Sequence, residues 1–170
     1  MQNIILIGFM GTGKTEVGML LAKKLKMTYI DTDSIIEKEQ GMTINDIFAK
    51  KGEERFRDME TKLLDELEGI EGRVISTGGG IILRPGNVIK LKSMGPLILL
   101  WADADTVYER TKNAGTRPLL NVEEPKSRIR EILEFRTPIY EGIADLKLDT
   151  SRLSPEEASN KIVKFIKEGK

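Results

Sequence analysis

Residues 8–15 read Gly8-Phe9-Met10-Gly11-Thr12-Gly13-Lys14-Thr15, and they carry the clearest fold signal in the chain. It satisfies the pattern G-x-x-x-x-G-K-[ST] of a phosphate-binding P-loop, and it lies between an apolar run, 3–7, and a segment of helical periodicity, 14–26. Glycines in such a loop let backbone N–H groups converge on a phosphate at a helix N-terminus. The stretch therefore predicts a strand, a phosphate-binding loop and a helix in succession, which is half of a βαβ unit.

Further strands and helices alternate along the chain. Short apolar runs predict strands at 3–7, 28–30, 74–76, 97–101 and 146–149. Helical patterns begin at about Thr43 and after Ser154, and also cover 53–68 and 105–112. This order predicts an α/β fold in which helices cover both faces of a parallel sheet and ligands bind beyond the carboxyl ends of its strands.

The composition limits the possible partners and chemistry. A chain of 170 residues, 39% apolar, predicts a single domain over 1–170. The 27 basic residues balance the 27 acidic ones, so we expect a monomer without nucleic-acid or membrane partners. Cysteine and histidine are absent from the sequence, which leaves Asp or Glu as the expected proton acceptor. With no secretory signal pattern and no apolar run of about 20 residues, a cytoplasmic location is expected.

The P-loop residues have expected roles in binding a nucleotide with Mg²⁺. Backbone N–H groups of the glycines face the β-phosphate, Lys14 reaches the β- and γ-phosphates, and the Thr15 hydroxyl binds the metal ion. The predicted nucleotide-binding set is Gly11, Thr12, Gly13, Lys14, Thr15 and Glu16.

Asp31 and Asp33 follow the second predicted strand. Because they alternate, we expect their side chains to point to opposite faces and to have different roles. Asp31 is a candidate to hold the hydration shell of Mg²⁺, and Asp33 is a candidate to accept a proton from a substrate hydroxyl. The alternative is that the two acids only begin a turn and cap a helix that starts near Ile35.

Gly78, Gly79 and Gly80 follow the third predicted strand. A glycine backbone can approach a ligand closely and donate its N–H groups, so the triplet predicts a substrate-facing loop. A plain tight turn is the alternative.

Two arginines are candidates to bind a carboxylate, whose two oxygens match the planar guanidinium group. Arg57 has Glu53 four residues before it and Glu60 three after it, so an ordinary exposed helical ion pair is the alternative. Arg136 has no acid four residues away on either side and precedes a Thr-Pro pair, which favours a binding role.

The segment 110–125 is long for a simple connection and contains Gly115, Pro118 and Pro125. Such loops often act as lids. Arg117 in its middle is a candidate to close over the nucleotide phosphates, stabilise the transition-state charge and exclude water.

These motifs, taken in order, resemble the shikimate kinase family over essentially the whole chain. The resemblance rests on the P-loop, the 31–33 triplet, the block from Ile47 to Glu60, the triple glycine, and the later motifs Arg117-Pro118-Leu119-Leu120, Arg136 with Tyr140, and Asp149-Thr150 before Arg152. The P-loop alone is generic, whereas the combination is specific.

The resemblance implies transfer of the ATP γ-phosphate to the 3-hydroxyl of shikimate, a step toward aromatic amino acids. It implies a three-layer P-loop kinase fold with a five-stranded parallel sheet, a helical substrate-binding insert at about 34–60 and a lid at about 112–125. It further implies one Mg²⁺ ion held by Thr15 with Asp31. The residues implied to bind shikimate are Asp33, Arg57, Arg136 and 78–80. Those implied to act in catalysis are Lys14, Asp33 and the lid residue Arg117. Arg117 and Arg152 are implied as additional ATP contacts.

Other functions stay open at this point. A gluconate kinase shares the P-loop. Arg57 and Arg136 do not exclude it, because gluconate also carries a carboxylate. The motifs Asp31-Thr32-Asp33 and Arg117-Pro118-Leu119-Leu120 favour shikimate. A nucleoside monophosphate kinase is less favoured, because no set of phosphate-binding arginines with a base pocket is evident. A non-catalytic nucleotide-binding regulator is the alternative from another class, and it would not need Asp33, Arg57 and Arg136.

Overall fold

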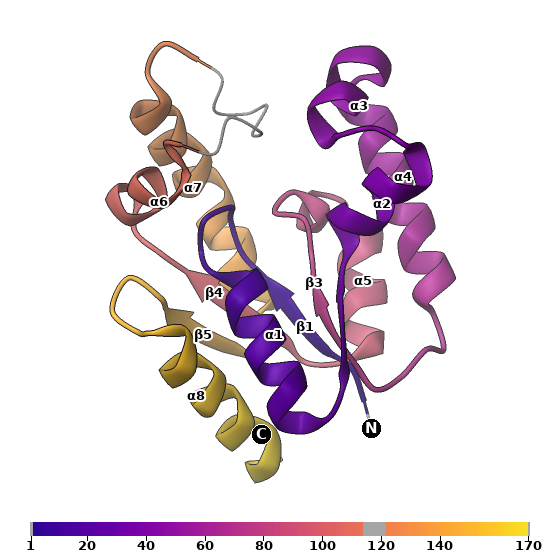
Figure 1. Ribbon diagram of the computed structural model, residues 1–170, viewed down its shortest axis with the longest axis vertical. Coiled ribbons are helices and arrows are strands. Elements are labelled where there is room, and N and C mark those ends of the chain that lie inside the picture. The colour runs from indigo at the N-terminus through magenta and orange to yellow at the C-terminus, as the bar shows by residue number, and fades with distance from the viewer. Residues whose placement is uncertain (1, 114–121, 170) are drawn as a thin grey trace.

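A computed structural model of the chain describes residues 2–113 and 122–169 (Figure 1). Within these residues, five parallel strands form one sheet in the order β2-β3-β1-β4-β5. The strands are β1 (Ile4–Ile7), β2 (Thr28–Asp31), β3 (Arg73–Ser76), β4 (Leu97–Trp101) and β5 (Leu146–Asp149). The five strands predicted from apolar runs are confirmed to within one residue at each end.

Helices connect the strands and cover both faces of the sheet. They are α1 (Lys14–Leu25), α2 (Thr32–Gln40), α3 (Ile44–Lys51), α4 (Glu53–Leu67), α5 (Pro85–Met94), α6 (Ala104–Thr111), α7 (Pro125–Ile143) and α8 (Pro155–Glu168), with a short 3₁₀ turn, η1 (Ile81–Leu83). The α/β architecture with layers on both sides of a parallel sheet is the predicted one. None of the described helices is long and apolar enough to cross a bilayer.

The side chains of the central strand, β1, alternate between the two faces of the sheet and contribute to a hydrophobic core on each face. Ile4 and Leu6 pack with residues of α1 and α8, two helices that lie side by side in Figure 1, whereas Ile5 and Ile7 pack on the opposite face with residues of α4 and α5. Successive strand side chains point to opposite faces, so a four-residue apolar strand can fill both cores. The rigid sheet between them fixes the positions of the loops at the carboxyl ends of its strands.

The capping signals correctly locate two helix starts. The Thr43 hydroxyl accepts a hydrogen bond from the Asp46 N–H at 3.1 Å and begins α3. Ser154 and Glu157 form the reciprocal capping box that begins α8.

Other helices depart from the predicted pattern. Helix α2 begins at Thr32 rather than near Ile35, and α5 and α7 are not predicted by the periodicity. Pro85 and Pro125 occupy the first turns of these two helices, where a missing backbone N–H costs nothing, and Pro138 lies inside α7. Proline therefore obscures α7, although its apolar face packs against β4 and η1.

Candidate active site

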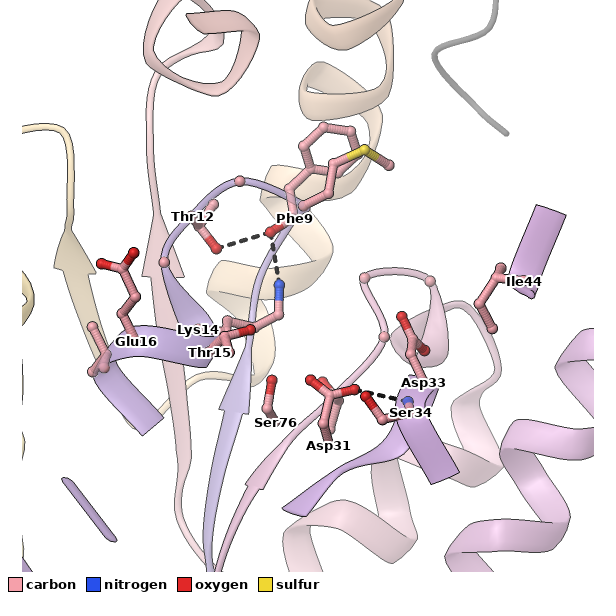
Figure 2. A pocket seen from close by; sticks show the side chains of 18 of the residues that line it. Phe9, Thr12, Lys14, Thr15, Glu16, Asp31, Asp33, Ser34, Ile44 and Ser76 are labelled. Carbon is pink, nitrogen blue, oxygen red and sulfur yellow. Dashed lines mark hydrogen bonds between the residues drawn. The ribbon is translucent and has the colours of Figure 1, made fainter. Parts of the chain in front are cut away.

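A cavity of about 690 Å³ opens beyond the carboxyl ends of the strands, where the parallel sheet predicts ligands to bind. Figure 2 shows Lys14, Asp31 and Asp33 in it, on α1, β2 and α2 respectively. The predicted residues that line it are Gly11, Thr12, Gly13, Lys14, Thr15, Glu16, Asp31, Asp33, Arg57, Gly78, Gly79, Gly80 and Arg136. The fold therefore brings together predicted residues from five separate segments of the chain.

The cavity has two parts with different chemistry. The P-loop end consists of residues 8–16. The arginine end consists of Asp33, Arg57, Glu60, Arg136 and the glycine loop 78–80.

At the P-loop end, the backbone turns around the ammonium group of Lys14. Gly11 and Gly13 have φ angles of +73° and +86°, in the left-handed region that favours glycine. Lys14 Nζ donates to the carbonyl oxygens of Gly8 and Phe9, both at 2.7 Å. Helix α1 has no side-chain cap, so the N–H groups of its first turn are available to an anion. This end of the cavity suits a phosphate chain.

Arg110 on α6 is a cavity residue that the sequence analysis missed. Its guanidinium group donates to the carbonyl oxygens of Gly11, at 3.1 Å, and of Thr150, at 2.8 Å. The Thr150 hydroxyl in turn donates to the Thr12 carbonyl oxygen at 2.9 Å. Arg110 therefore ties the P-loop to the segment after β5, a contact that no local pattern around Arg110 indicates.

The acids at 31 and 33 do not alternate along one strand as expected. The prediction of opposite strand faces is wrong for two reasons. Residues two apart on a strand point to the same face, and β2 ends at Asp31, so that Asp33 lies in the first turn of α2. Asp31 caps α2 by accepting a hydrogen bond from the Ser34 N–H at 3.1 Å, as its alternative role predicted. Asp33 instead faces the glycine loop: a Cβ atom on Gly78 would lie 2.6 Å from its Oδ1.

The glycine loop is both a tight turn and a close-packed wall of the arginine end. It leads directly into η1, since the Ile81 N–H donates to the Gly78 carbonyl oxygen. A Cβ on Gly78 would lie 2.7 Å from Glu60 Oε1, and a Cβ on Gly80 would overlap the guanidinium group of Arg57. The glycines are therefore needed so that buried charged groups can approach the backbone.

Arg57 is buried, at 6% exposure, so the interpretation as an exposed helical pair is wrong. Its Nη1 donates to Glu60 Oε2 at 2.7 Å and its Nη2 donates to Glu53 Oε1 at 2.9 Å. Burial lowers the pKa of Arg57, but the combined effect of Glu60 and Glu53 is larger and raises the pKa above its ordinary value. The guanidinium group therefore stays charged. The ion pairs predicted from the sequence are present, in a setting that makes them part of the cavity wall.

Glu60 is the second residue that the sequence analysis missed as a member of the site. It is fully buried, and among the described residues its Oε1 has no hydrogen-bond partner. Burial raises the pKa of Glu60 to about 7, although Arg57 opposes the shift. Its position three residues after Arg57 indicated only an ion pair, because its burial depends on packing against the glycine loop.

Arg136 lies on α7 and is also 6% exposed. Its Cζ is 5.9 Å from the centroid of the Phe9 ring, a cation–π contact to the P-loop. Within the described part of the chain no carboxylate forms an ion pair with it. One turn further along α7, Tyr140 donates a hydrogen bond to the carbonyl oxygen of Gly79, and burial raises the pKa of Tyr140 to about 12.

Two predicted residues are not placed in the cavity. Arg152 is exposed, with 86% of its side chain accessible, and its nearest acid is Asp149 at 3.5 Å; it does not line the cavity. Arg117 lies outside the described residues.

Thr15 and Asp31 fit a magnesium ion only if further ligands complete its coordination. Thr15 and Asp31 both line the cavity and offer hard oxygen donors, the type that Mg²⁺ prefers. In the described ranges there is no group of three or more acidic, His or Cys side chains that could hold a metal ion. The remaining ligands would therefore be water and phosphate oxygens, which is usual for Mg²⁺ bound with a nucleotide.

Comparisons with known proteins agree on one family. A family model for shikimate kinase matches residues 10–167. The shikimate kinase of Thermodesulfovibrio yellowstonii is 49% identical over 164 residues, which cover 96% of this chain and 94% of that protein. The structure titled as shikimate kinase from Acinetobacter baumannii in complex with shikimate is 38% identical, with a TM-score of 0.95, and the match covers 100% of this chain and 95% of that one.

A gluconokinase structure from Sinorhizobium meliloti is also similar. It shares 18% identity with a TM-score of 0.59, over 98% of this chain and 94% of that one. At this identity the likeness shows a common fold and carries no information on the substrate.

Proposed function

This chain belongs to the shikimate kinase family and is an ATP-dependent small-molecule kinase, and we propose how its cavity performs the transfer of the γ-phosphate to a hydroxyl of shikimate. ATP lies with its phosphates at the P-loop end. Shikimate lies at the arginine end, with its carboxylate held by Arg57 and Arg136 and its hydroxyls by Asp33 and the backbone of the glycine loop.

The observation that carries this proposal is the pair of buried arginines beside a buried acid and a glycine loop. Burying two guanidinium groups is costly unless anions compensate them. Arg57 is paired with the buried Glu60 and the exposed Glu53. An incoming carboxylate would supply the compensating charge for Arg136. A pure nucleotide switch would have no use for this arrangement.

The chemistry follows from position and charge. Asp33 accepts the proton of the attacking hydroxyl as its oxygen forms a bond to the γ-phosphorus, and the bond from that phosphorus to the bridging oxygen of ADP breaks. Lys14 turns from the carbonyl oxygens of Gly8 and Phe9 to the β- and γ-phosphate oxygens. The backbone N–H groups of the first turn of α1, which includes Glu16, and those of Gly11, Thr12 and Gly13 before it orient the phosphates.

Thr15 and Asp31 would hold one Mg²⁺ ion, which when bound neutralises phosphate charge in the transition state. We also propose that Arg117 stabilises this charge from a lid at about 112–125, and that Arg152 contacts the adenine side of ATP. The segment 34–60 would act as the substrate-binding insert of one domain. A monomeric, cytoplasmic enzyme of aromatic amino acid synthesis is the biological setting that we infer.

The test is ADP release from MgATP, measured in parallel with shikimate, with gluconate and without an acceptor. We expect turnover that depends on shikimate, with NMR of the product placing the phosphate on the 3-hydroxyl. Turnover with gluconate alone would contradict the assignment of the arginine end. ATP binding without turnover on either acid would favour the non-catalytic regulator.

A further inference from the structure

The hydroxyl of Tyr29 makes a contact that the proposed roles leave unexplained. Tyr29 and Asp31 are two residues apart on β2, so their side chains point to the same face of the sheet. Tyr29 Oη donates a hydrogen bond to Asp31 Oδ2 at 3.3 Å. The other oxygen, Oδ1, accepts the hydrogen bond from the Ser34 N–H. Both oxygens of the proposed metal-site carboxylate therefore accept a hydrogen bond within the protein.

The surroundings of the phenol belong to the same site. Ser76 on β3 is paired in register with Asp31 and is buried, and Figure 2 shows its side chain between Thr15 and Asp31. Thr15, Asp31 and Ser76 all line the cavity. The carboxylate that Tyr29 contacts therefore shares this part of the cavity with the hydroxyls of Thr15 and Ser76.

The packing of the ring against α1 is equally specific. A Cβ atom on Gly18 would lie 2.6 Å from Tyr29 Cε2, so only glycine leaves room for the ring at this point of the helix. Glycine inside a helix lowers its stability. The fold accepts this cost at a buried position where the ring directs its hydroxyl toward Asp31.

We propose that Tyr29 is a positioning residue for the metal site: its hydroxyl fixes the orientation of the Asp31 carboxylate toward the magnesium ion that accompanies the nucleotide. A carboxylate oxygen has two acceptor positions, so the hydrogen bond from Tyr29 leaves Oδ2 able to accept from a metal-bound water as well. Hydrogen bonds to a ligating carboxylate orient it and tune its affinity for the metal. This inference rests on the proposed roles of Thr15 and Asp31.

The experiment measures ADP affinity by calorimetry, once in EDTA and once in excess Mg²⁺, for the wild type, Tyr29→Phe, Asp31→Asn and the double variant. The ratio of the two affinities reports the contribution of the metal without any turnover. Asn caps helices as well as Asp does, so Asp31→Asn keeps the start of α2. Tyr108→Phe is the matched control, because this phenol lies on α6 and contacts Lys126 instead.

We expect Tyr29→Phe to reduce the magnesium-dependent gain in ADP affinity about tenfold, as for loss of one hydrogen bond to a charged group, with the affinity in EDTA unchanged. In the Asp31→Asn background the same substitution should add almost nothing, because the hydroxyl acts through the carboxylate. Tyr108→Phe should leave both affinities unchanged.

Three results would overturn the inference. An equal loss of ADP affinity with and without Mg²⁺ would assign Tyr29 a purely structural role. Additive effects in the double variant would mean that the hydroxyl does not act through Asp31. If Asp31→Asn alone left the magnesium effect intact, the proposed metal site itself would be wrong and the inference with it.

Discussion

At the P-loop end, the groups that face a phosphate come from consecutive residues, 8–16, and most of them belong to the backbone. At the arginine end, Asp33, Arg57 and Arg136 come from α2, α4 and α7, and the recognition groups are charged side chains. The P-loop end is determined by local conformation, such as the left-handed Gly11 and Gly13. The arginine end is determined by tertiary packing, which must bring buried charges of both signs into contact.

The two ends should therefore respond differently to substitution and to pH. Backbone donors at the P-loop end keep their charge distribution at any pH, and the flexible side chain of Lys14 supplies its positive charge. The arginine end contains a buried acid whose pKa is raised to about 7, Glu60, next to Arg57. We therefore expect substitutions and pH to affect the two ends separately.

The largest expected effect is on chemistry at the arginine end. Asp33→Asn removes the proposed proton acceptor while keeping the shape of the side chain, so turnover should fall about a thousandfold, the usual contribution of a general base. ATP affinity, which we assign to the P-loop end, should remain close to that of the wild type in calorimetry. Near-normal turnover in this variant would remove Asp33 from the mechanism, and loss of ATP binding would mean that the two ends are not separable.

The next effect is on stability, and it concerns Glu60. Its pKa is about 7 in the folded protein against 4.5 for the free side chain, so the folded state binds more protons between these pH values. The free energy of unfolding should therefore fall as pH rises from about 4.5 to 7, by up to about 3 kcal/mol, and remain level above that. Chemical denaturation of Glu60→Gln should lack this slope between pH 5 and 8.

Glu66→Gln is the matched control for this profile, because Glu66 lies on the same helix in an exposed pair with Lys62. Its profile should follow the wild type. A slope retained in Glu60→Gln would assign the titration to another group.

The same contrast explains what the sequence could predict. The P-loop, its lysine and the strand before it are fixed by contiguous residues, so local patterns identify them, and the predicted strands are confirmed. Asp33 was assigned to the wrong element because nothing in the 31–33 triplet indicates that β2 ends at Asp31 and α2 begins at once. Glu60 and Arg110 were missed because their roles depend on partners, the glycine loop and the segment after β5, that only the folded sheet brings near.

A smaller effect is expected from removing the positive charge of Lys14 at the P-loop end. Lys14→Met should lower kcat about a hundredfold, since one preorganised donor to the transferred phosphate is lost. The affinity for shikimate, measured calorimetrically without nucleotide, should stay unchanged because the arginine end is intact. Lys23→Met, an exposed lysine in the last turn of the same helix, should have no effect on either quantity. Weaker shikimate binding in Lys14→Met would show that the two ends are coupled in the free protein.

The smallest expected effect tests the geometry of carboxylate binding. Arg136→Lys keeps the positive charge and the contact with the Phe9 ring but loses the planar fork, so the KM for shikimate should rise about tenfold while the KM for ATP is unchanged. Arg130→Lys, at an exposed position on the same helix near Asp105, should behave as the wild type. A rise in both KM values would place Arg136 between the two substrates rather than at the arginine end alone, since its guanidinium already contacts the P-loop through Phe9. Its neighbour Tyr140, hydrogen-bonded to Gly79, would then be the link by which nucleotide binding reaches the glycine loop.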